Sequence, residues 1–413
     1  MNITCKMSNF KFSRHKELEA ALDSLQFKFI QDPSVRIKKS THIAPKSCID
    51  APNMSALELF NQLFGDEIIK HLLAHTNSNI SAKNEPKLMK EEIYKYFGHL
   101  LMLSVLHLPN YDLLFTNEPI KICYPGRENG LSLHRWKFIH QNISGSALKL
   151  KTYLVNSFMA ARGPGTVLVI DESRIPARTK KEQHLLLYNP SKPEKWAIEM
   201  FTMCDSGNYW HNFTLPKNCK AFTAANSFVK SVEHIDIQHH FVMDKHFLTF
   251  AQYNELINSK KHYFTACVGA RNAPANLFKS GLAQGLPMFR SRFARKGQSV
   301  AASYKRKGQL NFLSNGFRLE QRGDRTAKAR APLLTFYDTN KRAVDRFNQL
   351  MQYHHFRNRH HSVNQSLLIS FFEMALTNAF ILYKESRGEL LSHFNFLLSI
   401  ASGLLAKTIH DGH

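Results

Sequence analysis

The sequence lacks the features of a secreted or disulfide-stabilised protein. Its six cysteines, at positions 5, 48, 123, 204, 219 and 267, lie far apart and form no CxxC pair. This spacing favours neither a disulfide framework nor a cysteine-based metal site. The N-terminal segment MNITCKMSNFKF has no apolar core of the kind that defines a secretory signal. We therefore expect a reducing, intracellular compartment.

Long apolar runs are also missing. The stretches 97–106 and 394–406 are the longest that we identify, and His, Ser, Asn or Gly interrupt them. A bilayer requires roughly 20 consecutive apolar residues. These stretches are therefore expected to be buried helices, and no membrane partner is indicated.

Acidic residues are scarce relative to basic ones. The chain has 55 Lys and Arg against 32 Asp and Glu, which gives a net charge of +23. Twelve of the basic residues lie between Arg290 and Arg330, where the acids are Glu320 and Asp324. Because an anionic membrane is not indicated, the charge predicts a nucleic acid as the partner, with 290–330 as a phosphate-binding surface.

The first 160 residues have mainly helical patterns after a basic, proline-punctuated arm at 1–50. With 413 residues, 43% of them hydrophobic, the chain can form two or three domains. Ser55 and Glu58 have the spacing of a capping box. Apolar residues at helical spacing then predict helices at about 55–73, 87–106, 133–143 and 147–160. Residues 51–162 are thus expected to form a helical domain.

Strand patterns begin after the turn at Gly163-Pro-Gly. The apolar run 166–170 is typical of a central strand, and a hairpin is expected from 196–203 and 209–215 around Asp205-Ser-Gly-Asn. Further strands are predicted at 239–243, 263–268 and 333–337, and further helices at 224–232, 250–259, 344–352 and 364–384. The fold class is therefore α/β, with a helical domain first.

Three aspartates stand where a catalytic metal site could form. Asp171 and Asp244 each end a buried apolar strand, and parallel strands would bring both carboxylates to one edge of the sheet. Asp345 enters a helix that could fold back over that edge. Two Mg²⁺ or Mn²⁺ ions held by carboxylates can cleave or join phosphodiester bonds. Taken alone, the spacing is equally compatible with a helix cap, a turn or a salt bridge.

Longer motifs around these acids resemble piggyBac-type DDE transposases. The first block comprises Val169-Ile-Asp-Glu-Ser-Arg-Ile-Pro, Tyr188-Asn-Pro-Ser-Lys-Pro-Glu-Lys-Trp-Ala-Ile and Met203-Cys-Asp-Ser-Gly. The second is Phe241-Val-Met-Asp-Lys-His-Phe-Leu-Thr, and the third is Ala343-Val-Asp-Arg-Phe-Asn-Gln with the later Ala379-Phe-Ile-Leu-Tyr. The similarity runs from about residue 56 to about 405, and Leu391-Ser-His-Phe-Asn-Phe is part of it.

The resemblance implies an RNase H-like catalytic core at 163–269 and 333–413, interrupted by a basic insertion domain at 270–332. The preceding 51–162 would serve dimerisation and DNA binding. Asp171, Asp244 and Asp345 would be the catalytic, metal-binding aspartates. The implied activity is metal-dependent cleavage and strand transfer of transposon-end DNA at TTAA targets, by a homodimer in the nucleus.

The chain departs from the family pattern at three places. Asn348 stands where the family usually has a further Asp, and we expect it to support the metal site without adding charge. Val363 occupies a position that is often Trp. No cysteine follows Cys267, so no zinc-binding module is detected. These departures keep open the alternative of a transposase-derived DNA-binding protein of weak or no activity. Fold analogy and the general affinity of basic proteins for nucleic acid keep open a second alternative, an RNase H-like nuclease acting on RNA.

Four basic residues are candidates for DNA contact. Arg357 and Arg359 follow the third acidic block, and a guanidinium group can bind a phosphate through two hydrogen bonds. Lys192 and Lys195 lie within the first block. The alternative for all four residues is that they lie on the solvated surface without contacting DNA.

Overall fold

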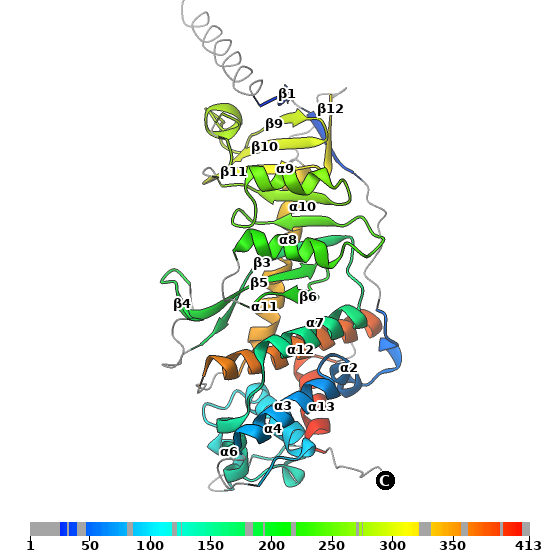
Figure 1. Ribbon diagram of the computed structural model, residues 1–413, viewed down its shortest axis with the longest axis vertical. Coiled ribbons are helices and arrows are strands. Elements are labelled where there is room, and N and C mark those ends of the chain that lie inside the picture. The colour runs from blue at the N-terminus through cyan, green and yellow to red at the C-terminus, as the bar shows by residue number, and fades with distance from the viewer. Residues whose placement is uncertain are drawn as a thin grey trace, which may run out of the picture.

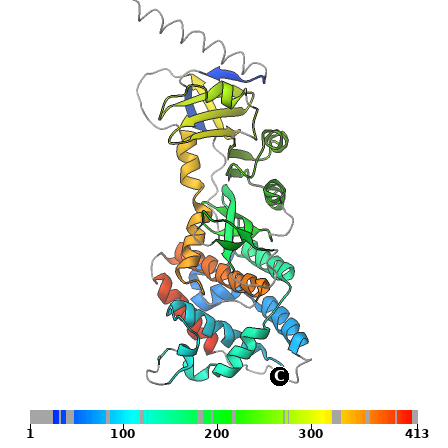
Figure 2. The same ribbon diagram turned by 90° about the vertical axis from the view of Figure 1, so that its left-hand side faces the viewer.

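The computed structural model describes residues 25–30, 33–38, 47–80, 86–117, 122–124, 126–177, 185–192, 195–215, 220–269, 272–274, 276–321, 332–356, 362–388 and 391–406. The protein is elongated, with a large sheet toward one end and a group of helices at the other (Figures 1 and 2). Both helices and strands are abundant, which confirms the α/β class.

The helical end forms from several helices, and serine side chains cap the N-termini of three of them, α2, α6 and α7. The capping box of Ser55 and Glu58 is present at the start of α2. The expected helix 55–73 is divided, because Phe64 leaves the helical conformation just before Gly65. The helices of this end are α2 (Ala56–Leu63), α3 (Asp66–Ile80), α4 (Lys90–Val105), α5 (Asp112–Phe115), α6 (Leu133–Asn142) and α7 (Ala147–Ala161).

One long helix, α12 (Val363–Arg387), passes through the centre of the protein (Figure 1). Its Phe372 ring stacks on Phe97 at 4.6 Å between centroids and meets Phe60 and Phe64 edge-on. By length and composition this helix alone, among the described residues, could span a membrane, but its apolar window is entirely buried in the fold. The helix predicted at 364–384 corresponds to this core helix, although its apolar run was not among the longest runs identified in the sequence. The last helix, α13 (His393–Leu405), packs on α4 and α2.

The sheet is mixed, with the order β1-β9-β10-β11-β8-β7-β3-β5-β4 and β6 paired to β5. Only β3, β7 and β8 pair in parallel, and α8 (Ala221–Ser231) and α9 (Phe250–Asn258) lie between these strands in the chain. The strand bounds are β1 (Lys28–Ile30), β3 (Val167–Pro176), β4 (Leu187–Tyr188), β5 (Trp196–Asp205), β6 (Trp210–Phe213), β7 (His240–Met243), β8 (Tyr263–Cys267), β9 (Ser291–Lys296), β10 (Ser299–Lys305) and β11 (Gln309–Ser314).

Two segments differ from the expectations for the basic regions. In the described part of the N-terminal arm, β1 pairs with β9, and β2 (Pro33–Ile37) pairs with β12 (Phe317–Gln321). In the basic segment after residue 270, β9, β10 and β11 continue the main sheet. The pairings of β1 with β9, of β2 with β12 and of β8 with β11 join residues far apart in sequence, which local periodicity does not reveal.

The predicted strand 333–337 is wrong, because these residues lie in the helix α10 (Pro332–Asn340). Leu333, Leu334 and Tyr337 are the buried residues of this helix. Their spacing defines one helical face, and a run of five residues, four of them apolar, is too short to distinguish the helical period from the strand period. Two residues separate the end of α10 from the next helix, α11 (Ala343–Tyr353).

Candidate functional site

Asp171 and Asp244 occupy adjacent positions at one edge of the parallel strands. In the register of β3 and β7, Ile170 lies opposite Met243, so the next residues on the two strands are these acids. Neighbouring strands lie about 4.8 Å apart. Asp171 does not end its strand as expected: β3 continues to Pro176 by pairing with β5, and only its parallel pairing stops at Ile170.

Both carboxylates project from the same face of the sheet. Val169 and Val242 belong to the larger hydrophobic core, whereas Ile170 and Met243 belong to the smaller core on the opposite face. Because side chains alternate along a strand, Asp171 and Asp244 share the face of the two valines. The Tyr337 hydroxyl of α10 donates a hydrogen bond of 3.3 Å to Asp244 Oδ1. The two acids therefore point toward the layer formed by α10 and α11.

The helix α11 brings Asp345 to this edge. Ser173, two residues after Asp171 in β3, donates a 2.6 Å hydrogen bond from Oγ to Asn348 Oδ1. Asp345 and Asn348 are three residues apart and share a helical face. Asp345 lies in the first turn of α11 and is exposed to solvent. Thus Asn348 fixes the helix against β3, and Asp345 lies one turn away.

The electrostatic coupling of these acids is visible at Asp171. Burial, together with the negative charges of Asp244, Asp345 and Glu172, raises the pKa of Asp171 to about 7, although a hydrogen bond from the Glu172 N–H acts in the opposite direction. Loss of hydration and neighbouring like charges both disfavour a carboxylate. A cation among these groups would relieve that repulsion.

The donor chemistry of the three aspartates suits Mg²⁺ or Mn²⁺, because both are hard ions that prefer carboxylate oxygens. Within the described part of the chain, however, no three His, Cys, Asp or Glu side chains are gathered closely enough to hold a metal ion. The three acids are close enough to affect one another electrostatically, but their carboxylates are not close enough together to hold one metal ion. Exposed Asp345 is the side chain with the most freedom to turn toward the other two.

Two residues beside Asp244 were not singled out from the sequence. Tyr337 is buried, and burial raises its pKa far above the usual value for tyrosine, so it is a stable hydrogen-bond donor. Lys341 lies near Asp244, and its ammonium group is 2.9 Å from Asp338 Oδ1. Burial is the main cause that lowers the pKa of Lys341, and the positive charge of Arg306 is the next largest. Because 333–337 was predicted to be a strand, the sequence did not indicate that Tyr337 and the following Lys341 lie beside Asp244.

The predicted DNA-contacting residues are only partly described. Lys192 and Lys195 are exposed near the ends of β4 and β5, beside the half-exposed rings of Tyr188 and Trp196, whose centroids are 4.9 Å apart. They lie outside the group formed by the three acids, although Lys192 is close enough to Glu199 to affect its pKa. Arg357 and Arg359 lie outside the described residues, so their role stays a prediction.

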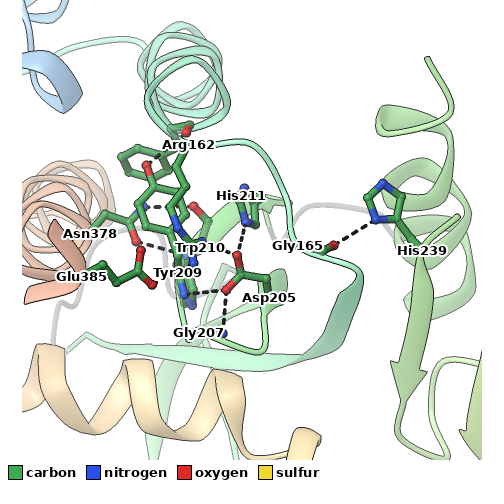
Figure 3. Close-up of polar contacts among 11 residues, drawn as sticks. Arg162, Gly165, Asp205, Gly207, Tyr209, Trp210, His211, His239, Asn378 and Glu385 are labelled. Atoms are coloured by element: carbon green, nitrogen blue, oxygen red, sulfur yellow. Dashed lines mark hydrogen bonds and ion pairs between the residues drawn. The ribbon is translucent and has the colours of Figure 1, made fainter. Parts of the chain in front are cut away.

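A separate buried polar cluster joins α7, the β5–β6 hairpin and α12 (Figure 3). The fully buried guanidinium of Arg162 forms ion pairs with Asp205 and with Glu385, the latter at 2.8 Å. Asp205 also accepts hydrogen bonds from the Gly207 N–H and from His211 Nε2. Arg162 lies 4.8 Å from the centre of the Tyr209 ring. Asp205, although part of the first motif block, therefore has a structural role where α7, the β5–β6 hairpin and α12 meet.

Comparisons with known proteins identify the family of this chain. The family model described as Transposase IS4 matches residues 55–380. No curated protein matches the chain. A solved structure described as a piggyBac transposase synaptic complex with hairpin DNA is similar, with a TM-score of 0.73 and 20% identity over 88% of this chain and 83% of that chain. The chain therefore belongs to this transposase family and has the RNase H-like fold of piggyBac transposase.

Proposed function

We propose that this protein is a piggyBac-type DNA transposase that uses Mg²⁺ or Mn²⁺, in two ions, to cleave and join phosphodiester bonds. The observation that carries the proposal is the alignment of Asp171 with Asp244 on adjacent parallel strands, with Asp345 within charge-interaction range. Divalent ions bound there supply charge neutralisation for the attacking and leaving oxygens.

The protein's own groups would orient the site around the DNA. Tyr337 holds one oxygen of Asp244 in place, which leaves the second oxygen available. Asn348 and Ser173 fix α11 so that Asp345 stays at the sheet edge. Lys341 places a positive charge near Asp244, where a DNA phosphate would lie. These contacts position the acids and the substrate backbone without entering the reaction.

The finer properties follow from the family. The similar solved structure is a synaptic complex that contains hairpin DNA. We infer that this chain acts on transposon-end DNA at TTAA targets, as a homodimer in the nucleus. The net charge of +23 supports binding to a polyanion.

The experiment is a plasmid nicking assay with purified full-length protein. We expect Mn²⁺- or Mg²⁺-dependent nicking that is lost in Asp171→Asn, Asp244→Asn and Asp345→Asn. Asp236→Asn, which changes an exposed acid before β7, is the matched control and should nick normally. Sequencing of nick sites tests the TTAA preference. Nicking that is unchanged in all three site variants would refute the proposal.

A second function, DNA binding without turnover, is favoured by one observation. The donor groups do not converge, and Asn348 adds no charge to them. In that case the wild type would bind DNA in a salt-sensitive way, without nicking in either metal, and Asp171→Asn would bind equally well. An active family member assayed in parallel shows whether the DNA and buffer permit cleavage.

A further inference from the structure

A polar pocket of about 410 Å³ lies at the edge of the sheet opposite the three aspartates. Its lining residues come from four segments: Lys38 after β2, Tyr263 at the start of β8, Arg295 with the β9–β10 turn, and the start of β12. Tyr263 pairs with His240, the first residue of β7, whereas Asp244 follows the last residue of that strand. The pocket and the acids are therefore at opposite ends of the parallel strands.

The charges that line this pocket are all positive. Lys38, Arg295 and Arg318 contribute three cations, and none of the described residues that line it is acidic. Lys38 extends over the Tyr263 ring at 5.6 Å and lies 3.4 Å from Gln298 Oε1. Burial, and then the nearby charge of Arg318, lower the pKa of Lys38.

The strand register increases this concentration of positive charge. Arg318 of β12 lies directly opposite Arg36 of β2, and Arg295 of β9 lies directly opposite Lys28 of β1. Two separate strand pairs thus place further basic residues, Arg36 and Lys28, beside two of the cations that line the pocket.

The other walls of the pocket suit an organic anion with a flat apolar part. The partly buried Tyr263 contributes an aromatic ring, whereas Phe317 and Leu319 line the pocket but are almost completely covered by the rest of the fold. A volume of this size lies in the range of roughly 300 to 1,000 Å³ that is usual for small-molecule sites, and is larger than a lone phosphate ion needs. Arginine forks bind phosphate oxygens, and aromatic rings stack with bases.

We propose that this pocket, lined by Lys38, Tyr263, Arg295 and Arg318, binds the phosphate of a nucleotide unit at a site separate from the metal-binding aspartates. A nucleic-acid strand held there would run past the end of the sheet remote from the acids. The proposal does not depend on catalysis, because none of these residues contributes to the acidic site.

The test measures binding on the Asp171→Asn background, so that strand cleavage cannot affect it. Fluorescence anisotropy with a labelled single-stranded oligonucleotide compares Arg295→Gln/Arg318→Gln with Lys149→Gln/Lys230→Gln. The control pair removes the same charge from exposed positions on α7 and α8. We expect a loss of about tenfold in affinity for the pocket variant and a much smaller loss for the control.

A second experiment uses a free nucleotide to distinguish whether the phosphate comes from a free nucleotide or from a nucleic-acid strand. Its result does not depend on contacts that DNA makes elsewhere on the protein. Adenosine monophosphate should raise the melting temperature of the parent protein but not that of the pocket variant, if a free nucleotide suffices. Binding of the oligonucleotide alone would identify a nucleic-acid strand as the source. Equal losses in the pocket and control variants, together with no shift from the nucleotide, would overturn the proposal. Unchanged circular dichroism spectra show that the variants fold.

Discussion

Asn348 Oδ1 accepts a 2.6 Å hydrogen bond from the Ser173 hydroxyl, which joins α11 to the strand that carries Asp171. This bond places an uncharged amide where the family usually has a carboxylate. The position of the helix is therefore preserved without a fourth negative charge. The consequence for metal binding can be measured directly.

Asn348→Asp should strengthen binding of divalent ions. A carboxylate at this position keeps an acceptor for Ser173 and adds a negative charge on the face of α11 that carries Asp345. We expect half-maximal Mn²⁺ binding at a lower concentration than in the wild type. Asn348→Ala is the control: it should lower the free energy of unfolding by about 1 kcal/mol through loss of the hydrogen bond, without tightening metal binding. Equal Mn²⁺ affinities for wild type and Asn348→Asp would contradict this interpretation.

Tyr337→Phe should loosen Asp244 while preserving the aromatic core. The phenol donates to Asp244 Oδ1, and its ring contacts Phe312 at 4.9 Å between centroids. We expect weaker metal-dependent nicking and a loss of about 1 kcal/mol in unfolding free energy. Tyr188→Phe, at an exposed ring on β4, is the matched control. Normal metal dependence in Tyr337→Phe would show that the hydroxyl does not position Asp244.

Asp205→Ala should be among the most destabilising single substitutions. Arg162 and Asp205 are both fully buried, so the change leaves a guanidinium charge without its main partner. Removing one member of a buried ion pair costs about 3 to 5 kcal/mol. Glu385→Gln should cost much less, because the Glu385 side chain is 39% exposed. Urea denaturation measures the free energy of unfolding of both variants. A similar small decrease for the two would contradict the structural role assigned to Asp205.

The buried histidines at or just before the starts of β7 and β8 predict loss of stability in acid. Burial lowers the pKa of His240 to about 3 and of His239 and His262 to about 4, below the ordinary value of 6.5. The unfolded chain therefore binds protons first, so this stability is complete above pH 6.5 and falls as the pH drops below it, down to the folded pKa values. At pH 5 each histidine costs up to about 2 kcal/mol.

Urea denaturation between pH 7.5 and pH 5 checks this prediction. His240→Gln should reduce the pH dependence of the unfolding free energy, whereas His134→Gln, at an exposed position, should not. A pH slope that is the same in wild type and His240→Gln would count against a buried neutral imidazole.

The sequence predicted the parts of this site that depend on local pattern. Apolar strands that end in an acid located Asp171 and Asp244, because buried parallel strands have continuous apolar runs. The contact of Asn348 with Ser173 was not predictable, since it depends on how α11 packs across the sheet. Tyr337 was missed because the short run 333–337, with four apolar residues, does not distinguish a helix from a strand. The basic pocket depends on pairing of β1 with β9 and of β2 with β12, between segments far apart in the chain.

The most direct test of the account is whether Asp171, Asp244 and Asp345 form one divalent-metal site. Electron paramagnetic resonance of free Mn²⁺ measures binding to the purified protein, with Asp236→Asn as the control. We predict that the wild type and the control bind Mn²⁺ and that each of Asp171→Asn, Asp244→Asn and Asp345→Asn binds it more weakly. Equal Mn²⁺ binding by the wild type and all three variants, each correctly folded, would contradict the assignment of these aspartates.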